Sequence, residues 1–192
     1  MQRYDIRRAQ QVLQRHTLRA GPGRGVAKVA EAFGMRVIVG ERAGGAPEFS
    51  GAPGPGAAPY PERLPFEQLL RTADMVSLHC PSTAATRGMI GAAQLALMKP
   101  DAILINTARG ALVDSAALAD ALRERRLGGA GIDVLPQEPP VDGDPLLNAD
   151  LPNLIVTPHI AWAAREARQR CIDEMAANIR DFQRGGRRGR VV

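Results

Sequence analysis

The chain has 192 residues, of which 45% are hydrophobic and 23% charged, so its composition predicts a folded globular protein rather than a disordered chain. No stretch approaches the roughly 18 uninterrupted apolar residues that indicate a membrane span. The two cysteines, Cys80 and Cys171, provide no disulfide framework, which favours a cytoplasmic protein.

The net charge of +5 is unevenly distributed along the chain. Residues 1–24 carry +5 and residues 180–192 carry +4, whereas residues 25–179 carry −4. A basic tail such as residues 185–192 can contact nucleic-acid phosphates without sequence preference. The whole chain has only seven aromatic residues and its acidic body offers no stacking platform, so we expect no nucleic-acid function.

The first part of the sequence predicts few helices or strands. Residues 1–22 have sparse apolar positions in an Arg/Gln background, which predicts a disordered or loosely helical extension or, alternatively, an organelle transit peptide. Apolar residues recur at helical spacing over residues 24–34, where Gly34 is a natural stop, and a short strand is expected at 35–39. Glycine and proline then predict a loop over residues 43–61.

From residue 66 onward, helices and strands alternate, which predicts βαβ units in a mostly parallel, doubly wound α/β sheet. The short helix at 115–126 has Ser115 as its expected N-cap. The other expected helices cover residues 66–71, 92–98 and 165–183, and the expected strands cover residues 75–79, 102–106, 130–134 and 154–157.

Polar residues follow the ends of several predicted strands. His79, Thr107, Arg109, Asp133 and His159 all fall just at or beyond a strand. Ligands of such sheets bind outside the carboxyl ends of the strands, so these side chains are candidates for a shared site. Each of them taken alone is more commonly a surface or capping residue.

Three segments carry a family resemblance. NTARGALVD at 106–114, GGAGIDVLPQEPP at 128–140 and NLIVTPHIAW at 153–162 resemble the D-isomer-specific 2-hydroxyacid dehydrogenase family, in the family's order and spacing. The similarity covers roughly residues 24–183 and is greatest to the glycerate dehydrogenase (hydroxypyruvate reductase) branch. The resemblance implies a Rossmann-type domain that uses NAD or NADP.

The resemblance also implies an active site. Arg109 would hold the carboxylate and carbonyl of a small 2-keto acid through its two-pronged guanidinium. His159 would exchange a proton with the carbonyl oxygen as hydride is transferred, and Glu138 would hydrogen-bond the other imidazole nitrogen. The expected substrates are hydroxypyruvate and glycerate, or glyoxylate.

A larger set of residues is expected to bind the cofactor by the same resemblance. Glu41 would accept hydrogen bonds from the adenine ribose and disfavour a 2′-phosphate, whereas Arg42 beside it could tolerate one, so NAD is expected and NADP stays open. The full expected set is Gly23, Glu41, Arg42, His79, Pro81, Thr86, Thr107, Ala108, Arg109, Asp133 and His159. We expect no metal.

The sequence departs from the family at its start. The glycine fingerprint is damaged, and Val12 and Leu13 are too few apolar residues for the strand that should precede it. The family's substrate-binding domain is absent, so weak or no turnover is expected. Residues 1–22 therefore read as an atypical extension, from a frameshifted or truncated reading frame or from a genuine short paralogue.

The resulting organisation has four parts. After residues 1–22, we expect a Rossmann-type NAD(P)-binding domain at 23–163, a C-terminal helix at 164–184 and an Arg/Gly-rich tail at 185–192. The resemblance implies a homodimer. The alternative function is a non-catalytic module that binds a dinucleotide or a protein partner.

Overall fold

The computed structural model describes residues 10–15, 22–40, 62–148 and 150–189. The chain forms two units, one ending at Pro158 and the other beginning at His159. The predicted loop at 43–61 lies outside the described residues.

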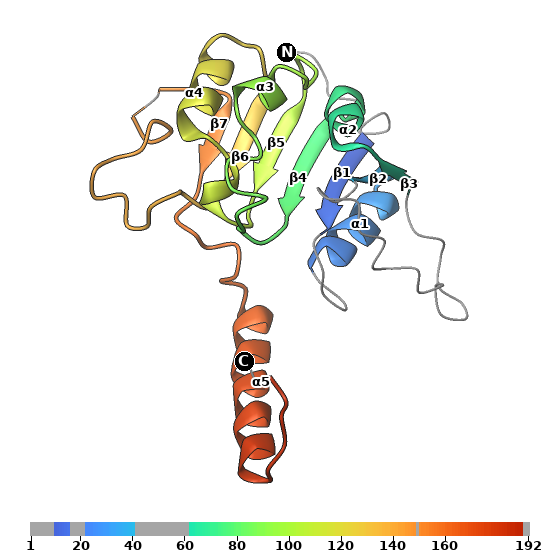
Figure 1. Cartoon of the computed structure of the whole chain (residues 1–192), viewed down its shortest axis with the longest axis vertical. Coiled ribbons are helices and arrows are strands. Elements are labelled where there is room, and N and C mark those ends of the chain that lie inside the picture. The colour runs from blue at the N-terminus through green and yellow to red at the C-terminus, as the bar shows by residue number, and fades with distance from the viewer. Residues whose placement is uncertain (1–9, 16–21, 41–61, 149, 190–192) are drawn as a thin grey trace. The chain divides into compact units, whose positions relative to one another are not determined.

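The first unit is built on one parallel sheet of seven strands in the order β3-β2-β1-β4-β5-β6-β7 (Figure 1). The chain adds strands outward from the centre in both directions, so the predicted doubly wound, Rossmann-type sheet is confirmed. The strands are β1 Gln10–Arg15, β2 Arg36–Gly40, β3 Glu62–Leu64, β4 Met75–His79, β5 Ile103–Asn106, β6 Gly129–Ile132 and β7 Leu154–Val156.

The first strand is present, so the prediction that it is missing was wrong. β1 lies at the centre of the sheet and pairs in parallel with both β2 and β4, with Gln10 opposite Arg36 and Arg15 opposite His79. A ladder is held by backbone N–H and C=O groups, which the Gln and Arg residues of β1 supply as well as apolar ones do. Apolar patterning therefore missed a strand inside the segment 1–22.

The helices agree with the predicted ones apart from their ends. The first unit contains α1 Pro22–Ala32, α2 Phe66–Thr72, α3 Ala92–Leu95, α4 Ser115–Arg123 and a short 3-10 turn at Gly110–Leu112. The second unit contains α5 Arg165–Gln183, as predicted.

The predicted N-cap of α4 was one residue too late. The Asp114 carboxylate accepts the backbone N–H groups of Ala116 and Ala117 at 3.0 and 3.1 Å, so Asp114 is the cap. Ser115 is the first helical residue, and its hydroxyl donates to the buried carboxylate of Asp144 at 3.0 Å. A carboxylate that accepts two N–H groups satisfies more of the orphan donors at the helix start than one hydroxyl can.

The core lies between the middle strands and the helices that follow them. One connected cluster contains fully buried leucines from α2, β4, α3, β5 and α4, and in α4 two of them, Leu118 and Leu122, fall at helical spacing. The five examples are Leu70, Leu78, Leu95, Leu104 and Leu118. Their packing fixes β4, β5 and β6 rigidly, and with them the carboxyl ends of these strands.

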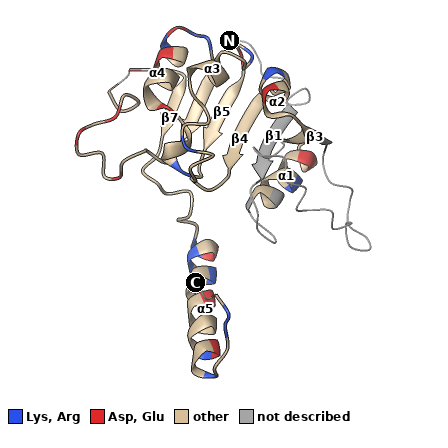
Figure 2. Ribbon diagram, viewed as in Figure 1, with Lys and Arg blue, Asp and Glu red and all other residues tan. Residues whose placement is uncertain are grey.

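The second unit is a single long helix followed by a returning tail. None of the α5 side chains is buried, and Figure 2 shows charged residues along its whole length. The Arg188 guanidinium donates to both carboxylate oxygens of Glu174 at 2.8 and 2.9 Å, and the Arg188 N–H donates to Asp181 at 2.8 Å. No helix among the described residues is long and apolar enough to cross a membrane.

Candidate active site

The carboxyl edge of the sheet has its switch point between β1 and β4, where the order of strands reverses. Gly23 is buried in the first turn of α1, and a Cβ built on it would lie 3.6 Å from the Cβ of His79. The start of α1 and the end of β4 therefore meet at this point, and the predicted contacts of Gly23 and His79 with a cofactor stay predictions. Glu41 and Arg42, the predicted ribose-binding residues, lie outside the described residues.

The surroundings of His79 favour its uncharged ring. Its Nε2 atom lies 2.9 Å from the hydroxyl of Ser77, two residues earlier on the same strand. Burial disfavours the imidazolium and lowers the pKa of His79 below its usual value. At neutral pH the ring can therefore donate or accept a hydrogen bond at this edge without carrying charge.

The loop after β4 is closed by Thr86, whose side chain is fully buried. Its hydroxyl donates to the Pro81 carbonyl at 2.7 Å and accepts the Thr83 N–H at 2.8 Å. Thr86 thus shapes the loop that carries Pro81, and its predicted contact with a cofactor stays a prediction. The Ser82 hydroxyl is buried with no hydrogen-bond partner in the described part of the chain, and the family motif gave no signal for it.

The turn after β5 presents three of the predicted residues. Asn106 is the last residue of the strand and is fully buried. Its amide nitrogen donates to the Arg109 carbonyl at 2.9 Å, and its side-chain oxygen accepts the Ala108 N–H at 3.1 Å. Thr107 and Arg109 are exposed on this turn, and the Arg109 guanidinium donates to the Ala108 carbonyl at 2.6 Å.

Asp133 follows β6 and is 4% exposed. Its backbone N–H donates to the Asn106 carbonyl at 2.9 Å, and its carboxylate accepts the Thr157 hydroxyl. The aspartate therefore joins the ends of three neighbouring strands, β5, β6 and β7. Its predicted contact with the nicotinamide stays a prediction.

Glu138 lies in the bend that follows Asp133. Its Oε1 atom accepts the Leu135 N–H at 2.7 Å. The backbone of Gly110, next to Arg109, packs directly against Leu135 and Pro136: a Cβ on Gly110 would come within 3.0 Å of atoms of both. The segments that carry Arg109 and Glu138 are therefore in backbone contact, a juxtaposition that no motif in the sequence revealed.

His159 is the first residue of the second unit. It has a left-handed backbone with φ +53°, and its carbonyl accepts the Trp162 indole N–H at 2.7 Å. Arg109 and Glu138 belong to the first unit, so the grouping of the three predicted catalytic residues stays a prediction. In the described ranges, no three His, Cys, Asp or Glu side chains gather in a group able to hold a metal ion.

Comparison with known proteins gives several close relatives. The chain is 48% identical to glycerate dehydrogenase of Methylorubrum extorquens over 163 residues, covering 85% of this chain and 47% of that protein. It is 43% identical to glyoxylate reductase of Korarchaeum cryptofilum, covering 85% of this chain and 46% of that protein. The chain thus spans about half the length of the curated relatives it matches.

Solved structures agree with the fold. The NAD-complexed D-isomer specific 2-hydroxyacid dehydrogenase of Lactobacillus delbrueckii ssp. bulgaricus superposes with a TM-score of 0.79 at 32% identity, covering 98% of this chain and 57% of that one. The family model described as "D-isomer specific 2-hydroxyacid dehydrogenase, NAD binding domain" matches residues 21–161. The chain therefore belongs to the D-isomer specific 2-hydroxyacid dehydrogenase family, and the matched part is the NAD-binding domain of that family.

Proposed function

We propose that this chain binds a nicotinamide dinucleotide and takes part in hydride transfer between that cofactor and a small 2-hydroxy or 2-keto acid. The observation that carries the proposal is the backbone contact between the turn of Arg109 and the bend of Glu138, at the edge of the sheet where this fold binds ligands. The names of the relatives, glycerate dehydrogenase and glyoxylate reductase, support glycerate, hydroxypyruvate or glyoxylate as substrate. The homodimer implied by the resemblance stays a prediction.

Residues at the switch point fit a dinucleotide. The first turn of α1 carries no acidic side chain, so its N–H groups, which have no acceptor within the helix, suit an anionic pyrophosphate. A Cβ on Gly23 would already be in contact with His79 at 3.6 Å, and the Ser82 hydroxyl is buried without a partner in the described part of the chain. His79 and Ser82 would contribute neutral hydrogen bonds, and Gly23 would allow the cofactor to approach the backbone closely.

The chemistry divides among three side chains. When bound, the reduced cofactor supplies a hydride to the carbonyl carbon of the keto acid. The Arg109 guanidinium would hold the substrate carboxylate with paired hydrogen bonds, which fixes the distance and angle of the carbonyl. His159 would donate a proton to the carbonyl oxygen, and Glu138 would stabilise the imidazolium and orient the ring.

The test measures binding and turnover separately. We expect NADH to bind the chain, with a change in nicotinamide fluorescence, and hydroxypyruvate or glyoxylate to cause only a slow loss of absorbance of the reduced nicotinamide, in keeping with the weak turnover expected from the sequence. Arg109→Lys should raise the KM for the keto acid at least 10-fold, because a lysine cannot make the paired contact. His159→Ala should lower kcat about 100-fold or more, because the general acid is lost.

Arg71→Lys is the matched control for the arginine. Arg71 lies in the last turn of α2, which leads to the amino end of β4 rather than to the carboxyl edge. Equal keto-acid kinetics in Arg109→Lys and Arg71→Lys would contradict the assignment of Arg109. NADH binding without any turnover that depends on the keto acid would instead favour the non-catalytic dinucleotide-binding alternative.

A further inference from the structure

Arg109 and Glu138 lie in the segments that follow β5 and β6. These two segments are joined by contacts that the proposed chemistry of Arg109 and Glu138 does not require. β5 and β6 pair in parallel with Asn106 opposite Ile132, so the chain leaves both strands at the same level of the sheet. Asn106 and Gly110 are the residues at which the end of β5 and the segment after it contact the segment after β6. Neither residue belongs to the set expected to touch substrate or cofactor.

Asn106 fixes the backbone of the turn that presents Arg109. The Arg109 carbonyl accepts two hydrogen bonds, from the Asn106 side-chain amide at 2.9 Å and from the Leu112 N–H at 3.2 Å. The other end of the same amide accepts the Ala108 N–H. The Asn106 side chain is fully buried, so these bonds are shielded from water and the backbone on both sides of the Arg109 side chain is held in place.

Gly110 fixes the distance between this turn and the Glu138 bend. A Cβ at Gly110 would lie within 3.0 Å of the Leu135 carbonyl and the Pro136 nitrogen. These are backbone atoms, and they cannot rotate away as the end of a flexible side chain can. The residue touched, Leu135, is also the one whose N–H donates to the Glu138 carboxylate.

We propose that Asn106 and Gly110 are positioning residues that preset the geometry of Arg109 and Glu138 before any ligand binds. The inference rests on the proposed function, because it assigns these two residues to the same site. Asn106 acts on substrate binding through Arg109. Gly110 acts on proton transfer through Glu138.

We expect substitutions at the two residues to have different kinetic effects. A merely structural role would instead give the same effect at both. Gly110→Ala must push the Leu135–Pro136 backbone away by at least about 1 Å, because the new Cβ would lie 2.0 Å from the Leu135 carbonyl carbon, and a misplacement of that size can cost about 100-fold in rate. We expect kcat to fall and the pH profile of kcat to shift, with the Kd for NADH within 2-fold of the parent. Asn106→Ser should instead raise the KM for the keto acid about 10-fold.

The matched controls lie in the same sheet. Gly131→Ala places a methyl group in open space on β6, and Asn153→Ser removes an amide that binds the Leu122 and Leu127 carbonyls at the amino end of β7. Both controls should keep the parent KM and pH profile. In hydrogen exchange, Gly110→Ala should speed exchange of the Leu135 amide, and Asn106→Ser should do so for the Ala108 amide.

The outcomes separate the two proposals. Binding of the keto acid to the chain loaded with NAD is measured by calorimetry alongside the kinetics, so an answer is obtained even where turnover is slow. If the parent neither binds nor reduces the keto acid, or if Arg109→Lys leaves both unchanged, the proposed function fails. If Arg109→Lys impairs them but Asn106→Ser and Gly110→Ala behave like their controls, this inference alone is overturned.

Discussion

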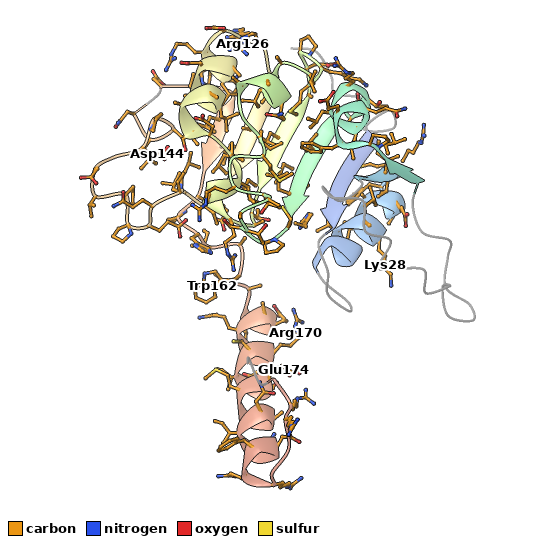
Figure 3. The ribbon with its side chains drawn as sticks, in the orientation of Figure 1. Lys28, Arg126, Asp144, Trp162, Arg170 and Glu174 are labelled. Atoms are coloured by element: carbon orange, nitrogen blue, oxygen red, sulfur yellow. The ribbon has the colours of Figure 1, made fainter. Side chains whose placement is uncertain are left out.

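Removal of the Asp144 carboxylate should destabilise the first unit markedly. Asp144 is 8% exposed and lies in the loop between β6 and β7 that also carries Glu138 (Figure 3). Its carboxylate accepts the Ser115 hydroxyl at 3.0 Å and the Leu146 N–H at 2.9 Å. Asp144→Ala would therefore leave two buried donors without these acceptors, at the point where the loop is fastened to α4.

The magnitude follows from the two lost hydrogen bonds. A bond to a charged group contributes about 1.5–3 kcal/mol, and an unsatisfied buried donor costs about 1–3 kcal/mol. Because the carboxylate also no longer has to be desolvated, we expect a net loss of about 2–4 kcal/mol for Asp144→Ala. Asp144→Asn keeps an oxygen for the Leu146 N–H and offers an amide to the Ser115 oxygen, so its loss should be about 1 kcal/mol.

The assay is urea unfolding followed by far-ultraviolet circular dichroism. Fluorescence is unsuitable, because the only tryptophan, Trp162, lies in the second unit. Asp142→Ala is the control, since Asp142 is exposed in the same loop and its loss should change the unfolding free energy by about 0.5 kcal/mol or less. If Asp144→Ala and Asp142→Ala had the same unfolding midpoint, the proposed fastening of the loop would be refuted.

Three further predictions concern single side chains. Asp114→Ala should cost about 1 kcal/mol in urea unfolding by removing the cap of α4, and an unchanged midpoint would contradict that assignment. Because burial lowers the pKa of His79, the unfolded chain takes up a proton that the folded chain resists, so parent stability should fall as pH drops below 6.5. In the same unfolding assay, the stability of His79→Gln should fall less than that of the parent between about pH 7 and pH 5. An equal loss of stability in both proteins would show that His79 is not its cause. Burial raises the pKa of Cys80 to about 11. A thiol reagent at about pH 8 should therefore modify the exposed Cys171 rapidly and Cys80 only on unfolding. Rapid modification of both cysteines in the folded chain would contradict this prediction.

Elements with a strong apolar pattern could be predicted from the sequence. β4 and α5 were predicted with the bounds that they have, because a short segment rich in apolar residues favours a strand and an apolar stripe at helical spacing favours a helix. β1 was missed because its two apolar residues stand among Gln and Arg, while its place in the sheet depends on backbone pairing with β2 and β4. That pairing is a property of the tertiary fold and leaves no local signal.

The site could be predicted only in part, for a similar reason. The family motifs supplied Arg109, Glu138 and Asp133 as candidates, and all three follow the carboxyl ends of β5 or β6. They gave no sign that Gly110 touches Leu135, because that contact is set by the register of β5 on β6 and by the path of the chain beyond both strands. Motifs name reactive side chains, whereas the backbone that aims them is fixed by residues far away in sequence.

The two edges of the sheet have a consequence for how the protein behaves at high concentration. Both edge strands, β3 and β7, are only three residues long. Pro65 directly follows β3, and Pro152 and Pro158 each stand two residues from an end of β7. A proline has no N–H to offer an incoming strand, and so short an edge gives little template for one. The sheet therefore resists growth by strand addition, which limits one common route to aggregation.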